Sequence, residues 1–257
     1  MIAAIACVDK NWGIGYQGDL LIKIPEDMKF FNQMTRDKTV VMGRKTYDSL
    51  PKNKKPLPDR DNVIITRNLI PNEFNYQKNE DGSSFYLLRQ VKKILDFISK
   101  CDNTVQIKDT FIIGGGQVYK ELLPYCEKAY ITIIDNAFEN ADTYFPKLNE
   151  LPDWYLTKIG KENEYNGFKY RFCEYEKFNY EIVDVVSDWT DFTEFIKIKM
   201  LDDNSVHMFN IKYYFHGSKT VEYLGSTNMP LHLETKENFD KFLVKLALYK
   251  QNKNIEV

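Results

Sequence analysis

The sequence predicts an α/β fold built on a mainly parallel sheet, and three observations support this prediction. Short apolar runs, such as Ile2–Val8 and Thr110–Ile113, alternate with helical patterns along most of the chain. Strands that alternate with helices are typical of a parallel sheet covered by helices. A glycine triplet at 114–116 separates a strand pattern from a helix pattern, which lets backbone approach a ligand. A chain of 257 residues is also long enough to bury a sizeable core.

The expected elements follow hydrophobic periodicity in chain order. Strands are predicted over 2–8, 39–42, 62–66, 85–87, 110–113 and 129–134. Helices are predicted from 25, from 45, over 89–100 and from 117 to 123, and the polar stretches 52–55 and 75–84 are expected to be loops. After Pro152 the helical patterns stop, and strands over 154–159 and 168–175 are joined by the turn-rich segment 164–167. These two strands predict a hairpin that closes the sheet.

The C-terminal segment differs in composition from the rest of the chain. From about residue 179 it has nine lysines, no arginine and all three histidines. Apolar residues alternate over 196–200 and 209–215, with a turn pattern over 202–205 between them. A helix is predicted from Lys236, because Phe239, Phe242, Leu243 and Leu246 lie at core spacing. The sequence therefore predicts a catalytic domain over 1–178 and a small α+β extension over 179–257, in which no motif indicates a function.

Composition and charge favour small-molecule chemistry. A net charge of −2 gives no electrostatic footprint for nucleic acid or an anionic membrane. The four cysteines are far apart and the histidines are confined to the last quarter, so we expect no metal site and reduced cysteines in a cytoplasmic protein. The apolar N-terminus is too short to span a bilayer, and no basic residue precedes it as in a secretory signal.

Residues 24–31 place a carboxylate on an otherwise apolar helix stripe. Asp27 and Phe31 share a face with Met34, behind a proline that suits the first helical position. A carboxylate on an inward face is costly unless a positive or hydrogen-bonding ligand meets it. First-turn acids also complement the helix dipole without any ligand. The octet alone leaves both interpretations open.

Three strand ends carry groups suited to phosphate. The glycine triplet 114–116 lies before a helix start but is not the six-residue dinucleotide fingerprint, so a plain turn remains an alternative. The segment 43–46 combines a glycine, two cations and a hydroxyl at another helix start, and Thr66-Arg67 adds a further hydroxyl and cation. Together they favour a phosphorylated dinucleotide, with Arg44 and Arg67 as candidates for an extra phosphate.

The order and spacing of these motifs resemble the dihydrofolate reductase family over residues 1–176. The resemblance is carried by 13–15, 24–28, 41–46, 56–60, 111–119 and 142–146. It implies an eight-stranded sheet flanked by helices and NADPH-dependent reduction of 7,8-dihydrofolate to tetrahydrofolate, for one-carbon metabolism. It also implies that antifolates inhibit the protein.

The resemblance further implies roles for individual residues. Asp27 would bind N3 and the 2-amino group of the pterin and favour protonation at N5, while hydride passes to C6. Thr132 would hydrogen-bond near Asp27, and Tyr119 would lie near the nicotinamide. The implied substrate-binding residues are Ile5, Asp27, Met28, Phe31, Leu57, Arg60, Ile113 and Thr132. The implied cofactor-binding residues are Ala6, Ile14, Gly15, Gly43, Arg44, Lys45, Thr46, Thr66, Arg67, Ile113, Gly115, Gly116, Gln117, Val118 and Tyr119.

Within the substrate set, Phe31 and Leu57 would sandwich the aminobenzoyl ring, and Arg60 would clamp the glutamate α-carboxylate in bidentate fashion. Ordinary core packing is the alternative explanation for Phe31 and Leu57. Two positions depart from the family pattern. Many members have a proline-tryptophan pair where this chain has Leu21-Ile22, which implies altered antifolate affinity and a slower proton step. A common glycine is Ala141 here, which implies a stiffer loop.

Two competing hypotheses remain open. One is a pyrimidine reductase of riboflavin synthesis, which shares the fold and NADPH but reduces an open-chain ribose phosphate. The helix start with Asp27 and the Arg60 clamp favour the folate substrate. The other is a reductase domain kept as a scaffold, with the extension as a partner-binding or self-association module.

Overall fold

The computed structural model describes residues 1–66, 76–78, 84–88, 109–178, 180–188, 190–200, 205–214, 219–224 and 236–253. The chain forms two compact units. The first comprises 1–147 and 158–174, and the second comprises 148–157 and 175–257. The sequence predicts a domain boundary between residues 178 and 179, whereas the second unit also includes the earlier segment 148–157.

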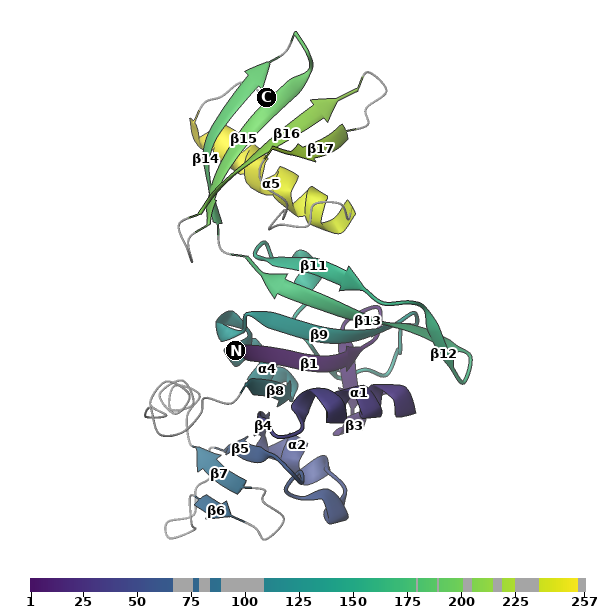
Figure 1. Cartoon of the computed structure of the whole chain (residues 1–257). Coiled ribbons are helices and arrows are strands. Elements are labelled where there is room, and N and C mark those ends of the chain that lie inside the picture. The colour runs from purple at the N-terminus through teal and green to yellow at the C-terminus, as the bar shows by residue number, and fades with distance from the viewer. Residues whose placement is uncertain are drawn as a thin grey trace. The chain divides into compact units, whose positions relative to one another are not determined.

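A large mixed sheet organises the described residues. Its strand order is β11-β13-β9-β1-β8-β4-β5-β7-β6, with β12 paired to β13, which makes ten strands in the part of the chain described (Figure 1). The strands are β1 (Ile2–Val8), β4 (Thr39–Gly43), β5 (Asp61–Ile65), β6 (Tyr76–Lys78), β7 (Ser84–Leu88), β8 (Thr110–Gly114), β9 (Lys128–Ile134), β11 (Trp154–Ile159), β12 (Asn163–Tyr165) and β13 (Phe168–Lys177).

The predicted fold class is confirmed. The pairs β1–β8, β1–β9, β4–β5, β4–β8 and β5–β7 are all parallel. Eight of the strands are those that the sequence predicts, and the short β6 and β12 extend the sheet. The prediction of a loop over 75–84 is wrong at 76–78, because β6 pairs antiparallel with β7 at the edge of the sheet. An edge strand needs no apolar pattern. The helix predicted over 89–100 lies outside the described residues.

Helix α1 (Pro25–Thr35) brings Asp27 to the sheet. It begins at Pro25, as predicted, because proline at the first helical position has its φ angle already set and needs no hydrogen-bond partner for a backbone N–H. Phe30, Phe31 and Met34 pack against the core formed by β1, β4, β5, β7 and β8. The other helical segments of this part of the chain are α2 (Arg44–Ser49), η1 (Lys52–Lys54), α4 (Gly116–Leu122), η2 (Leu123–Tyr125) and η3 (Leu148–Glu150).

A small separate sheet follows β1. It has the order β10-β2-β3, with β2 (Gly13–Tyr16), β3 (Asp19–Leu20) and β10 (Thr143–Tyr144). A Cβ on Gly13 would lie 2.8 Å from the Cβ of Ala141. The methyl group of Ala141 therefore occupies the space that any larger residue at position 13 would need.

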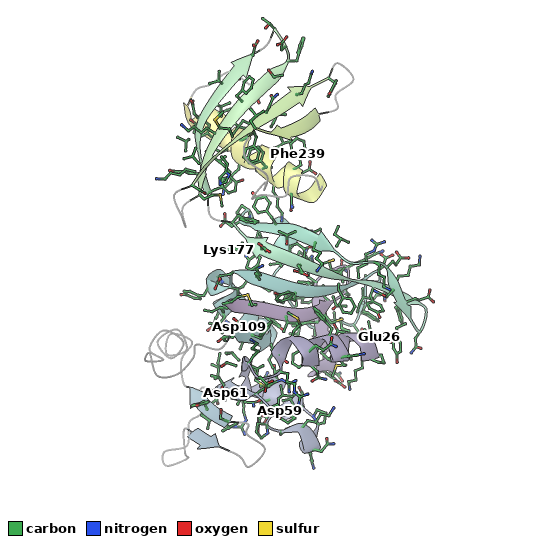
Figure 2. The ribbon with its side chains drawn as sticks, in the orientation of Figure 1. Glu26, Asp59, Asp61, Asp109, Lys177 and Phe239 are labelled. Carbon is green, nitrogen blue, oxygen red and sulfur yellow. The ribbon has the colours of Figure 1, made fainter. Side chains whose placement is uncertain are left out.

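The second unit contains a four-stranded antiparallel sheet in the order β14-β15-β16-β17. The strands are β14 (Tyr180–Asp188), β15 (Thr193–Met200), β16 (Val206–Tyr213) and β17 (Lys219–Tyr223). Helix α5 (Lys236–Lys253), which carries the labelled Phe239, begins at the predicted residue (Figure 2). Phe242 and Leu246 are buried against Ile196, Phe209 and other apolar residues of the sheet. The predicted α+β organisation of the extension is therefore confirmed for its described residues. No helix among the described residues is long and apolar enough to cross a membrane.

Candidate active site

Asp27 meets a hydroxyl group from the sheet. Thr132 on β9 donates a hydrogen bond of 2.6 Å from Oγ1 to Asp27 Oδ1, across 105 residues of sequence. Thr132 is 1% exposed, and register places it beside Cys7 on β1. In Figure 2 the labelled Glu26 marks the start of α1, next to Asp27. The structure thus brings together the two groups that the sequence paired by resemblance.

Burial raises the pKa of Asp27 above its usual value, and the hydrogen bond from Thr132 opposes that shift. Loss of hydration disfavours the charged carboxylate, whereas a donor to the carboxylate favours it. The carboxyl therefore takes up a proton more readily than an exposed one. A ligand with N–H donors or a positive charge would restore the charged form.

Tyr119 on α4 is held against β1. Its hydroxyl donates a 2.7 Å hydrogen bond to the carbonyl oxygen of Ile5, and its ring packs on Phe145 at 4.6 Å between centroids. Burial, together with the nearby Asp27, raises the pKa of Tyr119 far above its usual range. The hydroxyl therefore stays protonated and remains a donor to Ile5.

Arg60 is 5% exposed and held by three hydrogen bonds. Nε donates to Thr35 Oγ1 at 2.9 Å, one terminal nitrogen donates to the Pro58 carbonyl at 2.7 Å, and the other donates to Asn32 Oδ1 at 2.8 Å. The guanidinium lies 5.9 Å from the ring centre of Phe31. Burial lowers the pKa of Arg60, but an arginine stays protonated in any case.

The fixed guanidinium has five N–H donors, of which these bonds use three, so one donor on each terminal nitrogen is left for a carboxylate. Thr35 itself donates a 2.7 Å bond to the Phe31 carbonyl, which fixes its hydroxyl as an acceptor for Arg60. The sequence analysis missed Thr35 and Asn32. No local sequence pattern marks these two residues, because their contact with Arg60 forms only in the fold.

Leu57 is positioned by a buried asparagine. The side-chain oxygen of Asn62 accepts a bond from the Leu57 N–H, and its NH₂ donates to the Leu57 carbonyl, both at 2.9 Å. Asn62 is fully buried and Leu57 is 6% exposed. One side chain thus fixes the loop that carries Leu57. Phe31 is partly buried in the same cluster, and Met28 is 39% exposed.

The glycines at the strand ends lie where neighbouring atoms leave little room for a side chain. A Cβ on Gly115 would lie 3.3 Å from Thr46 Oγ1, and one on Gly43 would lie 3.2 Å from Val118. A Cβ on Gly116 would lie 3.0 Å from the Tyr144 carbonyl oxygen. Side chains at these positions would therefore crowd the end of the sheet.

The remaining cofactor candidates gather only in part. The Nε of Arg44 donates to both carboxylate oxygens of Asp48 at 3.1 Å, Lys45 is exposed, and Thr66 is 6% exposed at the end of β5. Gln117 donates to Glu121 at 2.6 Å. Ala6, Ile14 and Ile113 are partly buried and Gly15 is buried. Arg67 lies outside the described residues.

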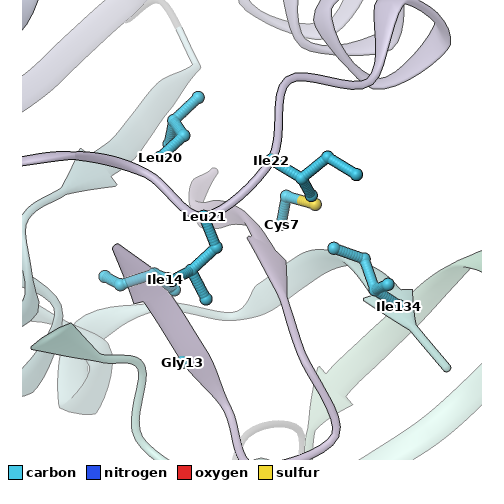
Figure 3. A pocket seen from close by; sticks show the side chains of 7 residues that line it. All are labelled: Cys7, Gly13, Ile14, Leu20, Leu21, Ile22 and Ile134. Carbon is cyan, nitrogen blue, oxygen red and sulfur yellow. The ribbon is translucent and has the colours of Figure 1, made fainter. Parts of the chain in front are cut away.

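An apolar pocket lies beside this site at the departure from the family pattern. Figure 3 shows the residues around it, which are Cys7, Gly13, Ile14, Leu20, Leu21, Ile22 and Ile134. The apolar lining raises the pKa of the Cys7 thiol well above its usual value, with a further contribution from Asp27. The thiol is therefore protonated and unreactive at neutral pH.

Asp9 was not predicted as a site residue. Its carboxylate fixes the turn that carries Gly13, one of the residues that line this pocket. Asp9 is fully buried, and its Oδ1 accepts backbone N–H bonds from Asn11 at 2.8 Å and Gly13 at 2.7 Å. Its Oδ2 accepts a 2.8 Å bond from the N–H of Phe138. The turn before β2 and the loop at 138 are therefore tied to one side chain.

Comparison with known proteins agrees with this geometry. A family model described as dihydrofolate reductase matches residues 1–177. A dihydrofolate reductase of Bacillus subtilis (strain 168) is 33% identical over 70% of this chain and 96% of its own length. One of Aedes albopictus is 32% identical over 67% of this chain and 95% of its own. A bifunctional dihydrofolate reductase-thymidylate synthase of Daucus carota is 31% identical over 71% of this chain and 35% of its own length.

Proposed function

The chain belongs to the dihydrofolate reductase family, and on that premise we propose that it is an NADPH-dependent enzyme that reduces 7,8-dihydrofolate to 5,6,7,8-tetrahydrofolate. The observation that carries the proposal is the Asp27–Thr132 pair at the beginning of α1. Reduction of dihydrofolate consumes one hydride and one proton. We propose that the enzyme is cytoplasmic, that it acts in one-carbon metabolism and that antifolates inhibit it.

Asp27 orients the pterin and keeps a proton available. Its carboxylate accepts hydrogen bonds from N3 and the 2-amino group, which offer two donors in the fork that a carboxylate matches. Burial raises its pKa, so the carboxyl group holds a proton more readily than an exposed one, which suits a general acid. Thr132 holds one oxygen in place, so the other end of the carboxyl group meets the substrate. The negative charge of Asp27 beside the bound pterin favours the protonated form of the pterin, and N5 is the atom that receives the proton.

Arg60 fixes the other end of the substrate. The glutamate α-carboxylate takes the two N–H donors that Thr35, Pro58 and Asn32 do not use. Phe31 and Leu57 hold the aminobenzoyl ring between α1 and the loop that Asn62 fixes. A guanidinium that is already oriented loses little freedom on binding, which favours affinity.

The residues at the strand ends fit a nicotinamide dinucleotide. Positions 43, 115 and 116 carry no side chain that would shield the backbone at the strand ends, and backbone N–H groups at such a place suit a pyrophosphate. Lys45, Thr46, Thr66 and Arg44 supply the cations and hydroxyls for phosphate oxygens. When bound, NADPH supplies the hydride that passes to C6. Tyr119, as a donor to Ile5, fixes the wall beside the reacting carbon.

We also propose that the C-terminal extension mediates self-association. The extension lies outside the segment that matches the family, and it has a complete core of its own around Phe209 and Phe242. A second sheet with its own core adds surface on which a partner can bind. The catalytic groups present argue against a reductase domain kept only as a scaffold.

The test is NADPH consumption by the full-length protein with dihydrofolate, in the presence and absence of methotrexate. We expect turnover that methotrexate blocks. Asp27→Asn should leave NADPH binding near wild type and lower kcat/KM at neutral pH by about 10²–10³-fold, with partial recovery at acidic pH where the substrate carries the proton. NADPH binding without turnover of dihydrofolate would overturn the proposal and favour the pyrimidine reductase. Full activity of Asp27→Asn at neutral pH would overturn the role of Asp27.

A further inference from the structure

One face of the sheet in the second unit is covered by its own helix, and no described helix or strand covers the opposite face. Helix α5 buries Ile196, Ile198, Phe209 and Ile211 on the inner face, and Figure 1 shows it lying along that face. Because side chains alternate along a strand, the neighbours of these residues point the other way. The outward residues include Glu181, Asp184 and Val186 on β14, Phe195, Lys197 and Lys199 on β15, and Val206 and Met208 on β16. We call this set the outer face.

The outer face exposes large apolar side chains together. Val186 is 56% exposed, Phe195 38%, Val206 51% and Met208 45%. Register places Val186 directly opposite Phe195, and Met208 beside Lys197. Single exposed apolar residues are ordinary, but a group on adjacent strands is typical of an interaction surface.

Charge is arranged on the outer face in two neighbouring rows of opposite sign. Glu181 and Asp184 lie on β14, and Lys199 and Lys197 lie opposite them on β15. A bulge between Ile182 and Asp184 inserts Val183 and so keeps Asp184 on the outward side. In a regular strand Asp184 would point inward. The bulge thereby completes the acidic row.

These rows make the outer face complementary to itself. A two-fold axis parallel to the strands, between β14 and β15, stacks the sheets of two copies with their strands aligned. The axis places each β14 residue over its own register partner in the second copy. Glu181 then faces Lys199, Asp184 faces Lys197, and Val186 faces Phe195. Each of these three levels joins opposite charges or two apolar side chains.

We propose that the outer face is the self-association surface of the extension, and that its partner is a second copy of this chain related by that two-fold axis. The proposal rests on the self-association inferred above and not on the reduction of dihydrofolate. The two rows set the alignment of the copies, while Val186 and Phe195 supply the apolar contact.

The test is sedimentation velocity of full-length protein over a range of concentrations, with two charge-reversal variants. Lys197→Glu/Lys199→Glu gives an all-acidic face, and Glu181→Lys/Asp184→Lys gives an all-basic face. We expect a wild-type dimer and at least ~100-fold weaker dimerisation of either variant alone. An equimolar mixture of the two variants should restore a dimer, because an acidic face then meets a basic one. Lys52→Glu/Lys54→Glu, with the same change of net charge on the exposed η1, should dimerise like wild type.

Each outcome decides a separate point. A monomeric wild type at every concentration would overturn self-association itself. A dimer that survives both reversals would overturn the assignment to the outer face, and failure of the mixture to restore a dimer would overturn the two-fold arrangement. Dihydrofolate turnover, measured on the same samples, should stay near wild type in all of them. Loss of turnover in the wild type would concern the proposed reductase function and would leave this test standing.

Discussion

Asp27 in the first unit and Glu194 in the second are both shielded from water, and their partners differ. Glu194 on β15 is fully buried, and it is paired with Lys250 of α5, itself 5% exposed, and with the hydroxyl of Ser187 at 3.2 Å. Across the described residues, one side-chain donor meets Asp27, the hydroxyl of Thr132. The second unit thus compensates its own buried charge with a cation, whereas Asp27, for which we propose a ligand-binding role, has only a hydroxyl partner among the described side chains. Such incomplete compensation distinguishes a binding site from a core.

Removing the cation from the second unit would test this comparison most strongly. Lys250→Met keeps the aliphatic stem but leaves Glu194 as a buried charge without its cation, which costs about 3–5 kcal/mol in the free energy of unfolding. The double variant Lys250→Met/Glu194→Leu should recover most of that loss, since buried ion pairs are often replaceable by apolar pairs. Urea unfolding measures both. Equal destabilisation of the single and double variants would show that packing, and not charge, dominates at this position.

Backbone compensation gives the next largest expected effect. The Asn238 side chain on α5 is fully buried and binds both the N–H and the carbonyl of Leu156, at 2.8 and 2.6 Å. Asn238→Ala would leave both backbone groups unsatisfied. Each unsatisfied group costs about 1–3 kcal/mol, so we expect the free energy of unfolding to fall by about 3 kcal/mol. Thermal unfolding is the measurement, with Asp240→Ala, an exposed position on the same helix, as the matched control. A Tm change no larger than that of the control would contradict the assigned role.

The smallest expected effect sharpens the first half of the comparison. Burial places the folded-state pKa of Asp27 above its unfolded value, so the folded protein holds the proton more tightly. Stability therefore falls as pH rises from the unfolded pKa of about 3.9 to the folded pKa. Thr132→Val removes the hydrogen bond that lowers the folded-state pKa of Asp27. The pH range over which stability falls should therefore extend to higher pH, and the free energy of unfolding at neutral pH should drop by about 1–2 kcal/mol.

Urea unfolding of the unliganded protein at a series of pH values would measure that window. Thr132→Ser keeps the hydroxyl and should retain the wild-type upper limit. If the valine variant also retained the wild-type limit, the hydroxyl would not control the ionisation of Asp27.

Hydrophobic periodicity and the order of motifs predicted most of the fold, because apolar strands and amphipathic helices have a local sequence pattern. The same signal located the helix from Lys236 and the strand around Ile198. The groups that position the site left none. Thr35 and Asn32 look like ordinary helix residues, and Asn62 looks like part of a strand, until Arg60 and Leu57 are brought to them by the fold. Asp9 resembled a surface turn residue because its three donors are backbone groups.

The extent of the second unit was hidden for a related reason. Tyr155 lies in a strand that periodicity assigns to the catalytic sheet, yet its side chain is fully buried in the core with Tyr180 and Phe242. Its hydroxyl is 2.7 Å from that of Tyr180, and burial raises the pKa of Tyr155 to about 12. A break in composition marks where a segment changes character along the chain. It does not reveal which earlier residues the segment packs against.

The pairing of Leu156 with Asn238 has a consequence for synthesis on the ribosome. The two residues are 82 positions apart, so the strand emerges well before the helix that satisfies its backbone. At ~5–20 residues per second, roughly 4–16 s of translation separate them. During that interval the backbone N–H and carbonyl of Leu156 lack their Asn238 partner, and Tyr155 lacks the helix that helps to bury it. Synthesis of α5 therefore decides when the strand that carries Leu156 becomes protected from aggregation.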